Sequence, residues 1–392
     1  MKRFSARIPC LLPAALCLLL VGCGRAPAPQ FTLNMQGRDP KDFVNNKENA
    51  ENIKGRQDIA TALYAMFGEP DDPYVFPESG LDLAKIKLAA GPFGGNADGS
   101  QRGLYRQHCV HCHGITGDGA GPTAQFLNPY PRDYRRGMYK FKSTERAARP
   151  TTADLRRIVH EGIAGTAMPS FGLLPSDEID ALVEYVKYLS IRGEVETSMG
   201  ITVYTDEEPL DMTRTALVDT HLKPIADAWA AADQAIIEVP DHPSVADQKQ
   251  WLAGGEALFR GAKAQCMKCH GPTALGDGSE EALFDDWNKE KNLEFAHRWL
   301  LPKQQIQPRN LRMGIYRFGR SPADMYRRVH AGINGTPMPG GFIGPGNPNN
   351  LKPEEIWQIV DYIRTLPYGD IDPALGNQIT WNAQRSSTNH TE

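Results

Sequence analysis

The chain has 392 residues, of which 41% are hydrophobic, so it is long enough for two or three modest domains with their own cores and is no disordered tail. Its 37 glycines and 30 prolines favour compact units with much loop over long uninterrupted helices or large sheets. The formal net charge of −4 at pH 7 provides no basic excess, so nucleic acid is not an expected partner.

Residues 1–22 are predicted to be an export signal. Lys2, Arg3 and Arg7 form a basic start, and a mainly apolar run follows at residues 8–21. Fourteen residues are too few to span a bilayer comfortably, which favours a signal peptide over a transmembrane helix. The run ends at Leu-Val-Gly-Cys23, which resembles the lipobox of bacterial lipoproteins. We therefore expect an exported lipoprotein, anchored through acylated Cys23 to a bacterial membrane and facing the periplasm. The alternative is an ordinary cleaved signal with an incidental cysteine.

Cysteine usage is consistent with export. Removal of the signal leaves five of the seven cysteines and takes the net charge to −7. One of the five is the predicted lipid site, and the other four lie in two C-x-x-C-H motifs, so no thiol remains for a structural disulfide. Residues 23–96 form a tether and an N-terminal extension that contain no cluster with recognisable chemistry. We expect residues 31–96 either to wrap the first domain or to dock onto a partner.

The two C-x-x-C-H motifs carry the strongest chemical signal. They are Cys109, Cys112 and His113 in the first and Cys266, Cys269 and His270 in the second. In c-type haem attachment, the two thiols add across the haem vinyl groups and the adjacent histidine binds the iron. A zinc site would need a second pair of thiols or imidazoles near each motif, and a thioredoxin-like redox pair would need a βαβ pattern. Neither pattern is evident, so the sequence predicts two covalently bound c haems.

The chain repeats itself around these motifs. Gly-Asp-Gly follows each motif, then Gly-x-Tyr-x-Phe occurs at 137–141 and 314–318, and Gly-Thr-x-Met-Pro occurs at 165–169 and 335–339. The order of these blocks is the same in both copies. We therefore place one domain at 97–192 and a second at 247–370. An acidic linker at 193–246 joins them, and a flexible tail at 371–392 follows.

Helical periodicity is clearest around the Met-Pro element. Apolar residues within 155–159 recur at helical spacing before Gly162 ends the run. Ser176 is the expected cap of a closing helix that ends near Gly193. Residues 206–241 carry many acidic side chains, and we expect them to form a connecting segment on the surface.

Each repeat also offers a sixth ligand for iron. Met168 and Met338 precede proline in a loop just after a helix, 55 and 68 residues after the motif histidines. Ligation by histidine and methionine saturates the iron and raises its reduction potential relative to more basic ligand pairs, which suits one-electron transfer. His160 and His330 recur eight residues before the methionines, and ligation by two histidines is the alternative, because imidazole is equally competent.

Basic residues follow each attachment motif. Residues 131–149 carry a net charge of +5, and a similar stretch lies at 309–328. Haem propionates at a domain edge need cationic or hydrogen-bonding partners, and arginine offers a bidentate fork for this purpose. The candidates for these contacts are Arg132, Tyr139, Arg309 and Tyr316. The alternative is a solvated basic face that steers an acidic partner.

Together these motifs resemble the class I cytochrome c fold. The second copy has G-x-x-L-F before C-x-x-C-H-G, at Gly255, Leu258 and Phe259, and each copy ends with G-T-x-M-P. The first copy departs from the opening pattern, with Leu104-Tyr105 only a few residues before the motif. The resemblance implies a mainly α chain with two tandem class I cytochrome c domains, each a small helical bundle around a covalent haem.

The function that the resemblance implies is electron transfer by a dihaem cytochrome c rather than enzymatic catalysis. We expect an electron carrier, or a cytochrome subunit of a quinol-oxidising or terminal oxidase complex, in a membrane-associated respiratory chain, with redox proteins of that complex as partners. The cytochrome subunits of alternative complex III and of haem-copper oxidases are similar. Two alternatives are a dihaem peroxidase-like enzyme, which needs one iron with an open sixth position, and an electron-accepting subunit of a periplasmic dehydrogenase.

Overall fold

The computed structural model describes residues 28–33, 50–279, 281–284, 301–302, 304–341, 346–371 and 379–381. The predicted signal peptide, Cys23 and most of the predicted tail lie outside these residues. Within these ranges, none of the helices combines the length and the hydrophobicity that a membrane span requires.

The chain is mainly α, as the sequence predicts, and its strands are short. The N-terminal part contains α3 (Ala50–Phe67), β1 (Gly68–Glu69), β2 (Asp72–Pro73), η1 (Pro77–Ser79), α4 (Leu83–Ala89), α5 (Leu104–His108), α6 (Val110–His113), η2 (Ala124–Phe126), η3 (Tyr134–Arg136), α7 (Thr152–Glu161) and α8 (Ser176–Tyr204). The middle contains α9 (Arg214–Ala216), the π-helical η4 (Leu217–Leu222), α10 (Lys223–Ala230) and η5 (Ala231–Ala235). The C-terminal part contains α11 (Gln248–Arg260), α12 (Cys266–His270), η7 (Leu311–Met313), α14 (Pro322–Ala331), α15 (Pro353–Thr365), η8 (Leu366–Tyr368), β3 (Gly369–Ile371) and β4 (Ile379–Trp381). Strand β1 pairs antiparallel with β2, and β3 with β4.

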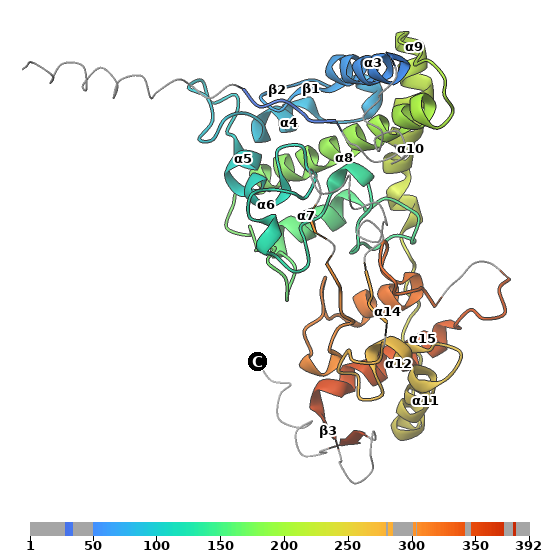
Figure 1. Ribbon diagram of the computed structural model, residues 1–392. Coiled ribbons are helices and arrows are strands. Elements are labelled where there is room, and N and C mark those ends of the chain that lie inside the picture. The colour runs from blue at the N-terminus through green and yellow to red at the C-terminus, as the bar shows by residue number, and fades with distance from the viewer. Residues whose placement is uncertain are drawn as a thin grey trace, which may run out of the picture.

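These helices form two bodies, one above the other in Figure 1. Each body has its own cluster of buried apolar side chains. In the first body, α3, α4, α7 and η3 pack against the long helix α8. In the second body, α11 and α14 pack against α15. The two bodies contain the two repeats, so the repeated sequence encodes two separately packed units.

Helix α8 is longer than the sequence predicts. It does not stop near Gly193 but continues to Tyr204. Glycine weakens a helix interior by about 1 kcal/mol relative to alanine. Here, however, the missing side chain lets α8 lie against η3, because a Cβ on Gly193 would be 2.3 Å from the Cα of Arg135. The predicted helix end is therefore wrong: this glycine serves close packing rather than helix termination.

The acidic segment at 206–241 is not merely a surface connection, so that expectation is also wrong. Leu210, Leu217, Leu222 and Trp229 are buried and belong to the apolar cluster of the first body. Helix α10 packs against α8, while the acidic side chains of η4 and α10, Asp219 and Asp227, are exposed. The segment is amphipathic, and its apolar face packs on the first body. The acidic charge of the sequence gave no indication of this apolar face.

The N-terminal extension wraps the first body, which was one of the two expectations for it. Ile59, Leu63 and Ile86, from α3 and α4, are buried in the same cluster as α8. The hydroxyl of Tyr188 on α8 donates a hydrogen bond of 2.6 Å to the carbonyl oxygen of Phe67 at the end of α3. The described part of the extension is thus a component of the first core.

Equivalent segments of the two repeats meet where the bodies touch. Phe141 and Phe318, which occupy the same place in the repeat, stack with their ring centroids 6.2 Å apart. The guanidinium of Arg157 lies 4.6 Å from the Phe318 ring centroid and donates two hydrogen bonds, of 2.9 and 3.0 Å, to the carboxylate of buried Asp324. Phe141 and Phe318 are equivalent residues, whereas Arg157 and Asp324 occupy different places in the repeat. The two repeats therefore dock through corresponding segments, but the contacts between them are not all reciprocal.

Candidate functional site

Both C-x-x-C-H motifs fold into a short helical turn, α6 in the first body and α12 in the second. The glycine after each motif has a left-handed backbone, with φ of 74° at Gly114 and 81° at Gly271. A Cβ there would lie 2.1 Å from a carboxylate oxygen of Asp118 or Asp277. These are the aspartates of the repeated Gly-Asp-Gly element. The backbone therefore requires the glycine at both sites, and the motif and Gly-Asp-Gly form one unit.

The motif histidines are oriented in the same way in both bodies. Nδ1 of His113 lies 3.1 Å from the carbonyl oxygen of Arg132, and Nδ1 of His270 lies 3.0 Å from that of Arg309. Because a carbonyl oxygen can only accept, Nδ1 carries the proton and Nε2 keeps its lone pair. This orientation of an imidazole by its second nitrogen is typical of metal-binding histidines.

The surroundings keep both imidazoles neutral. Burial lowers the pKa of His113 to about 4, and it also lowers the pKa of His270. The ring of His113 stacks on Tyr134 of η3, with centroids 4.6 Å apart and rings 15° from parallel. A metal-binding histidine must be deprotonated at Nε2, so this environment suits a ligand.

The four motif cysteines are free thiols and half-buried. Burial raises the pKa of Cys109 to about 12 and that of Cys266 to about 11. Sγ of Cys112 lies 3.2 Å from Oγ1 of Thr123, and Sγ of Cys269 borders the cavity described below. Within the described residues, each motif therefore offers two unpaired thiols and one neutral imidazole.

The two methionine loops share one conformation. Helices α7 and α14 are followed directly by Gly162 and Gly332, which both have φ of 70°. In the first loop, the amide of Ile163 donates to the carbonyl oxygen of Met168, and the amide of Met168 donates to Oγ1 of Thr166, both at 3.1 Å. The corresponding two bonds in the second loop are both 3.2 Å. The repeated Gly-Thr-x-Met-Pro sequence thus encodes a closed loop around each methionine.

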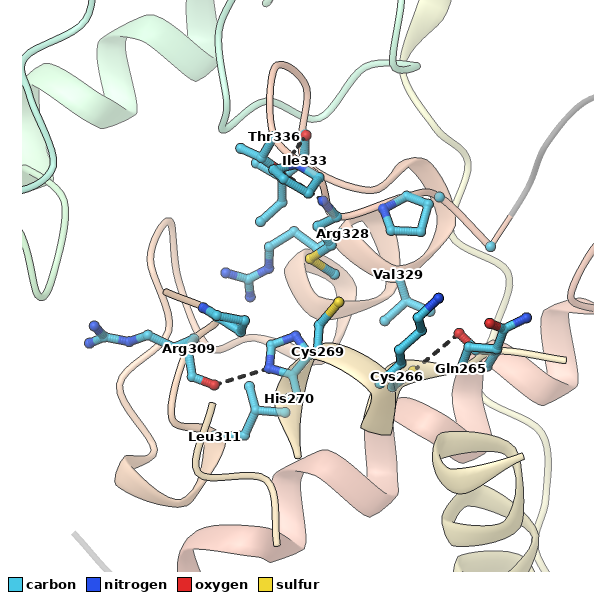
Figure 2. A pocket seen from close by; sticks show the side chains of 18 of the residues that line it. Gln265, Cys266, Cys269, His270, Arg309, Leu311, Arg328, Val329, Ile333 and Thr336 are labelled. Carbon is cyan, nitrogen blue, oxygen red and sulfur yellow. Dashed lines mark hydrogen bonds between the residues drawn. The ribbon is translucent and has the colours of Figure 1, made fainter. Parts of the chain in front are cut away.

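A cavity of about 1210 Å³ lies beside the second motif (Figure 2). Its lining includes Cys266, Cys269 and His270 from α12, and Met338 from the methionine loop. The volume exceeds the roughly 300–1,000 Å³ of common small-molecule pockets. The two thiols can attach a haem covalently, and the imidazole and the thioether can bind its iron from the two sides. The residues present therefore fit haem c.

His160 and His330, the alternative iron ligands, lie in different surroundings from Met338. His330 is absent from the cavity lining; its Nε2 lies 3.3 Å from Oε1 of Glu145, and its ring stacks on Tyr326. In the first body, His160 is exposed at the end of α7. These positions favour Met338 over His330 as a ligand, and the ligand assignments stay predictions.

The propionate candidates lie in different surroundings. Arg309 and Tyr316 line the cavity, where Nε of Arg309 donates to the carbonyl oxygen of Ile315 at 3.0 Å. The hydroxyl of Tyr139, in contrast, lies 2.7 Å from Oγ of Ser190 in the core of the first body. The backbone carbonyl oxygens of Arg132 and Arg309 orient the motif histidines. The sequence predicted a role only for the side chains of these two arginines. The propionate contacts stay predictions.

Arg328 is a cavity-lining residue that the sequence did not single out as a site residue. It lies on α14 beside the cavity (Figure 2), where Nη2 donates to the carbonyl oxygen of Gly319 at 2.6 Å. Burial lowers its pKa to about 10, so it remains a cation. The first repeat has Ile158 at this place. The signal that could have identified Arg328 is a charged residue at a position that is apolar in the helical pattern of the first repeat.

Comparison with known families matches the two repeats separately. The family model described as cytochrome c oxidase, cbb3-type, subunit III matches residues 97–186, and the model described as cytochrome c matches residues 252–367. A search of curated proteins found no match. Among solved structures, a chain of a reducing HAO-like protein complex from Kuenenia stuttgartiensis is 23% identical. The match covers 67% of this chain and 94% of that chain, with a TM-score of 0.48.

Proposed function

The chain is a c-type cytochrome with two cytochrome c domains, and from this premise we propose that it carries two covalent c haems and transfers single electrons in a membrane-associated respiratory chain. The observation that carries this proposal is the repetition of one complete ligand set in one geometry. Each domain has a motif histidine oriented through Nδ1 and a methionine in a closed loop. Two equally equipped sites favour two redox centres of the same kind.

Each residue type has a distinct task at such a site. The motif thiols hold the haem, the imidazole binds the iron on one side, and the methionine binds it on the other. The proposed iron ligands are His113 and Met168 in the first domain and His270 and Met338 in the second. When bound, haem supplies one-electron chemistry, while the chain fixes ligand orientation and surroundings.

A carrier is favoured over a peroxidase-like enzyme because both methionine loops are closed by the same backbone bonds. An enzyme that binds peroxide needs one iron with an open or displaceable sixth position. Addition of carbon monoxide to the fully reduced protein tests this difference by absorbance. We expect the spectra of both haems to stay unchanged. Ready binding at one haem would support the peroxidase-like alternative.

The proposed setting is a lipid-anchored subunit or carrier in a quinol-oxidising or terminal oxidase complex. Two features support this setting: the likeness of residues 97–186 to an oxidase subunit family and the lipobox-like sequence before Cys23. In Cys23→Ser, the protein should move from washed membranes to the soluble periplasmic fraction. Cys17→Ser, inside the predicted signal, is the matched control and should stay on the membrane. Copurification of the wild type with a dehydrogenase instead of a respiratory complex would favour the acceptor-subunit alternative.

A further inference from the structure

We propose that Arg146, a residue of the first domain, positions the methionine loop of the second haem site. Ligation of the second iron then depends on one side chain supplied by the first domain. This inference rests on the proposed function, because it takes Met338 as an iron ligand.

The guanidinium of Arg146 crosses the domain interface and binds three backbone carbonyls of the second domain. Nη1 donates to the carbonyl oxygens of Met338 at 3.0 Å and Ala331 at 3.3 Å, and Nη2 donates to that of Thr336 at 3.2 Å. Ala331 is the last residue of α14, and Thr336 and Met338 belong to the loop that follows it. Because a guanidinium is planar and its donors point in fixed directions, it holds the three carbonyls in one arrangement.

The hydrogen bonds within the Met338 loop join neutral groups, so the bonds from Arg146 can add to the stability of the loop. The amide of Met338 donates to Oγ1 of Thr336, and the carbonyl of Met338 accepts from the amide of Ile333, both at 3.2 Å, the long end of the normal range. Hydrogen bonds from a charged donor are stronger than those between neutral groups. Figure 2 shows the loop at Ile333 and Thr336 reaching toward the ribbon of the first domain. Arg146 thus adds three hydrogen bonds from a charged donor to a loop whose own bonds join neutral groups.

The segment that carries Arg146 is itself fixed to the first body. Nζ of Lys142 donates to the carbonyl oxygens of Glu145 at 2.5 Å and Arg146 at 3.0 Å, and the amide of Glu145 donates to the carbonyl oxygen of Ala235 at 2.9 Å. Phe141, just before this segment, lines the cavity of the second domain. A shift of the first body would therefore move the guanidinium relative to the Met338 loop.

Among the described residues, the contact between the first methionine loop and the second domain is close packing and not a set of hydrogen bonds. The first methionine loop meets Arg309 of the second domain by close packing, since a Cβ on Gly165 would be 2.3 Å from Nη2 of Arg309. Each methionine loop thus lies against an arginine of the other domain. Within the described part of the chain, hydrogen bonds from the other domain to loop carbonyls are found at the second methionine loop, where Arg146 makes three of them.

The test compares Arg146→Gln with Arg157→Gln in the ferric holoprotein. Arg157 crosses the same interface to Asp324 but makes no bond to the loop, so its variant is the control for docking. Cyanide displaces a methionine ligand, and titration followed by absorbance reports how firmly each methionine is held. Met338→Ala identifies the second haem. In Arg146→Gln we expect about tenfold tighter cyanide binding at the second haem only, equivalent to about 1.4 kcal/mol. Arg157→Gln should bind cyanide like the wild type.

Arg146→Lys is the second variant, and it carries the test if Arg146→Gln does not fold. Lysine keeps the charge but lacks the fork, so we expect an intermediate cyanide affinity. Wild-type affinity in both Arg146 variants, or an equal shift in Arg157→Gln, would overturn the positioning role. In that case a high-spin haem in Met338→Ala would leave the proposed function standing. An unchanged spectrum in Met338→Ala would instead overturn both.

Discussion

Replacement of Gly193 by alanine should destabilise the first domain, although alanine is the better helix former. A Cβ at this position would lie 2.3 Å from the Cα and 2.6 Å from the carbonyl oxygen of Arg135, whereas ordinary contact begins near 3.4 Å. Helix α8 and η3 would have to separate by about 1 Å. Overpacking costs about 1–3 kcal/mol, and we expect the upper end because the obstructing atoms belong to backbone. A gain of about 1 kcal/mol in helix propensity leaves a net loss of about 2 kcal/mol.

Gly200→Ala is the matched control on the same helix. A Cβ there meets only the Tyr204 ring, at 3.7 Å, so this variant should gain about 1 kcal/mol. Denaturant unfolding of the holoproteins, followed by circular dichroism, should separate the two variants by about 3 kcal/mol. Because η3 carries Tyr134, which stacks on His113, Gly193→Ala should also perturb the first haem spectrum and leave the second unchanged. A Gly193→Ala protein as stable as Gly200→Ala would refute the close packing of α8 on η3.

Three further predictions concern the sites and the interface. Tyr105→Phe removes the buried hydroxyl that donates to the carbonyl oxygen of Gly114 at 2.8 Å, so the free energy of unfolding should fall by about 1–3 kcal/mol, measured with denaturant. Burial raises the pKa of Asp324, but the hydrogen bonds from Arg157 and others outweigh it and bring the pKa below 3.8. The stability that this pair provides is therefore present above pH 3.8 and lost as the pH falls through the lowered pKa. The difference in unfolding free energy between wild type and Arg157→Gln should decrease over this acidic range. Alanine at both thiols of the second motif should reduce the bound haem, measured as the pyridine haemochrome, from two per chain to one.

Local chemistry was the part of the molecule that could be predicted from the sequence. The C-x-x-C-H-G motif, the Gly-Asp-Gly element and the Gly-Thr-x-Met-Pro loop are each encoded within a few neighbouring residues. Their repetition indicated two similar units before any contact was known. The structure adds the reason for particular residues, such as the left-handed backbone of Gly114 and Gly271.

Long-range packing was the part that could not be predicted. Gly193 has the sequence signature of a helix end, and only the approach of Arg135 shows why the helix continues. The acidic charge of 206–241 gave no sign that Trp229 is buried in the first core. Arg146 looked like one member of a basic stretch, because nothing in its neighbourhood indicates contacts with carbonyls almost 200 residues away. Such contacts follow from how two folded bodies meet, which no periodicity records.

Methionine closure of both irons is the property that makes electron transfer the expected function. Its most direct test is the spin state of the ferric haems in Met168→Ala and in Met338→Ala, measured by electron paramagnetic resonance. We expect each variant to convert one of two low-spin haems to high spin, at the first site in Met168→Ala and at the second in Met338→Ala. Low-spin spectra identical to the wild type in both variants would contradict methionine ligation and favour His160 and His330 as the ligands.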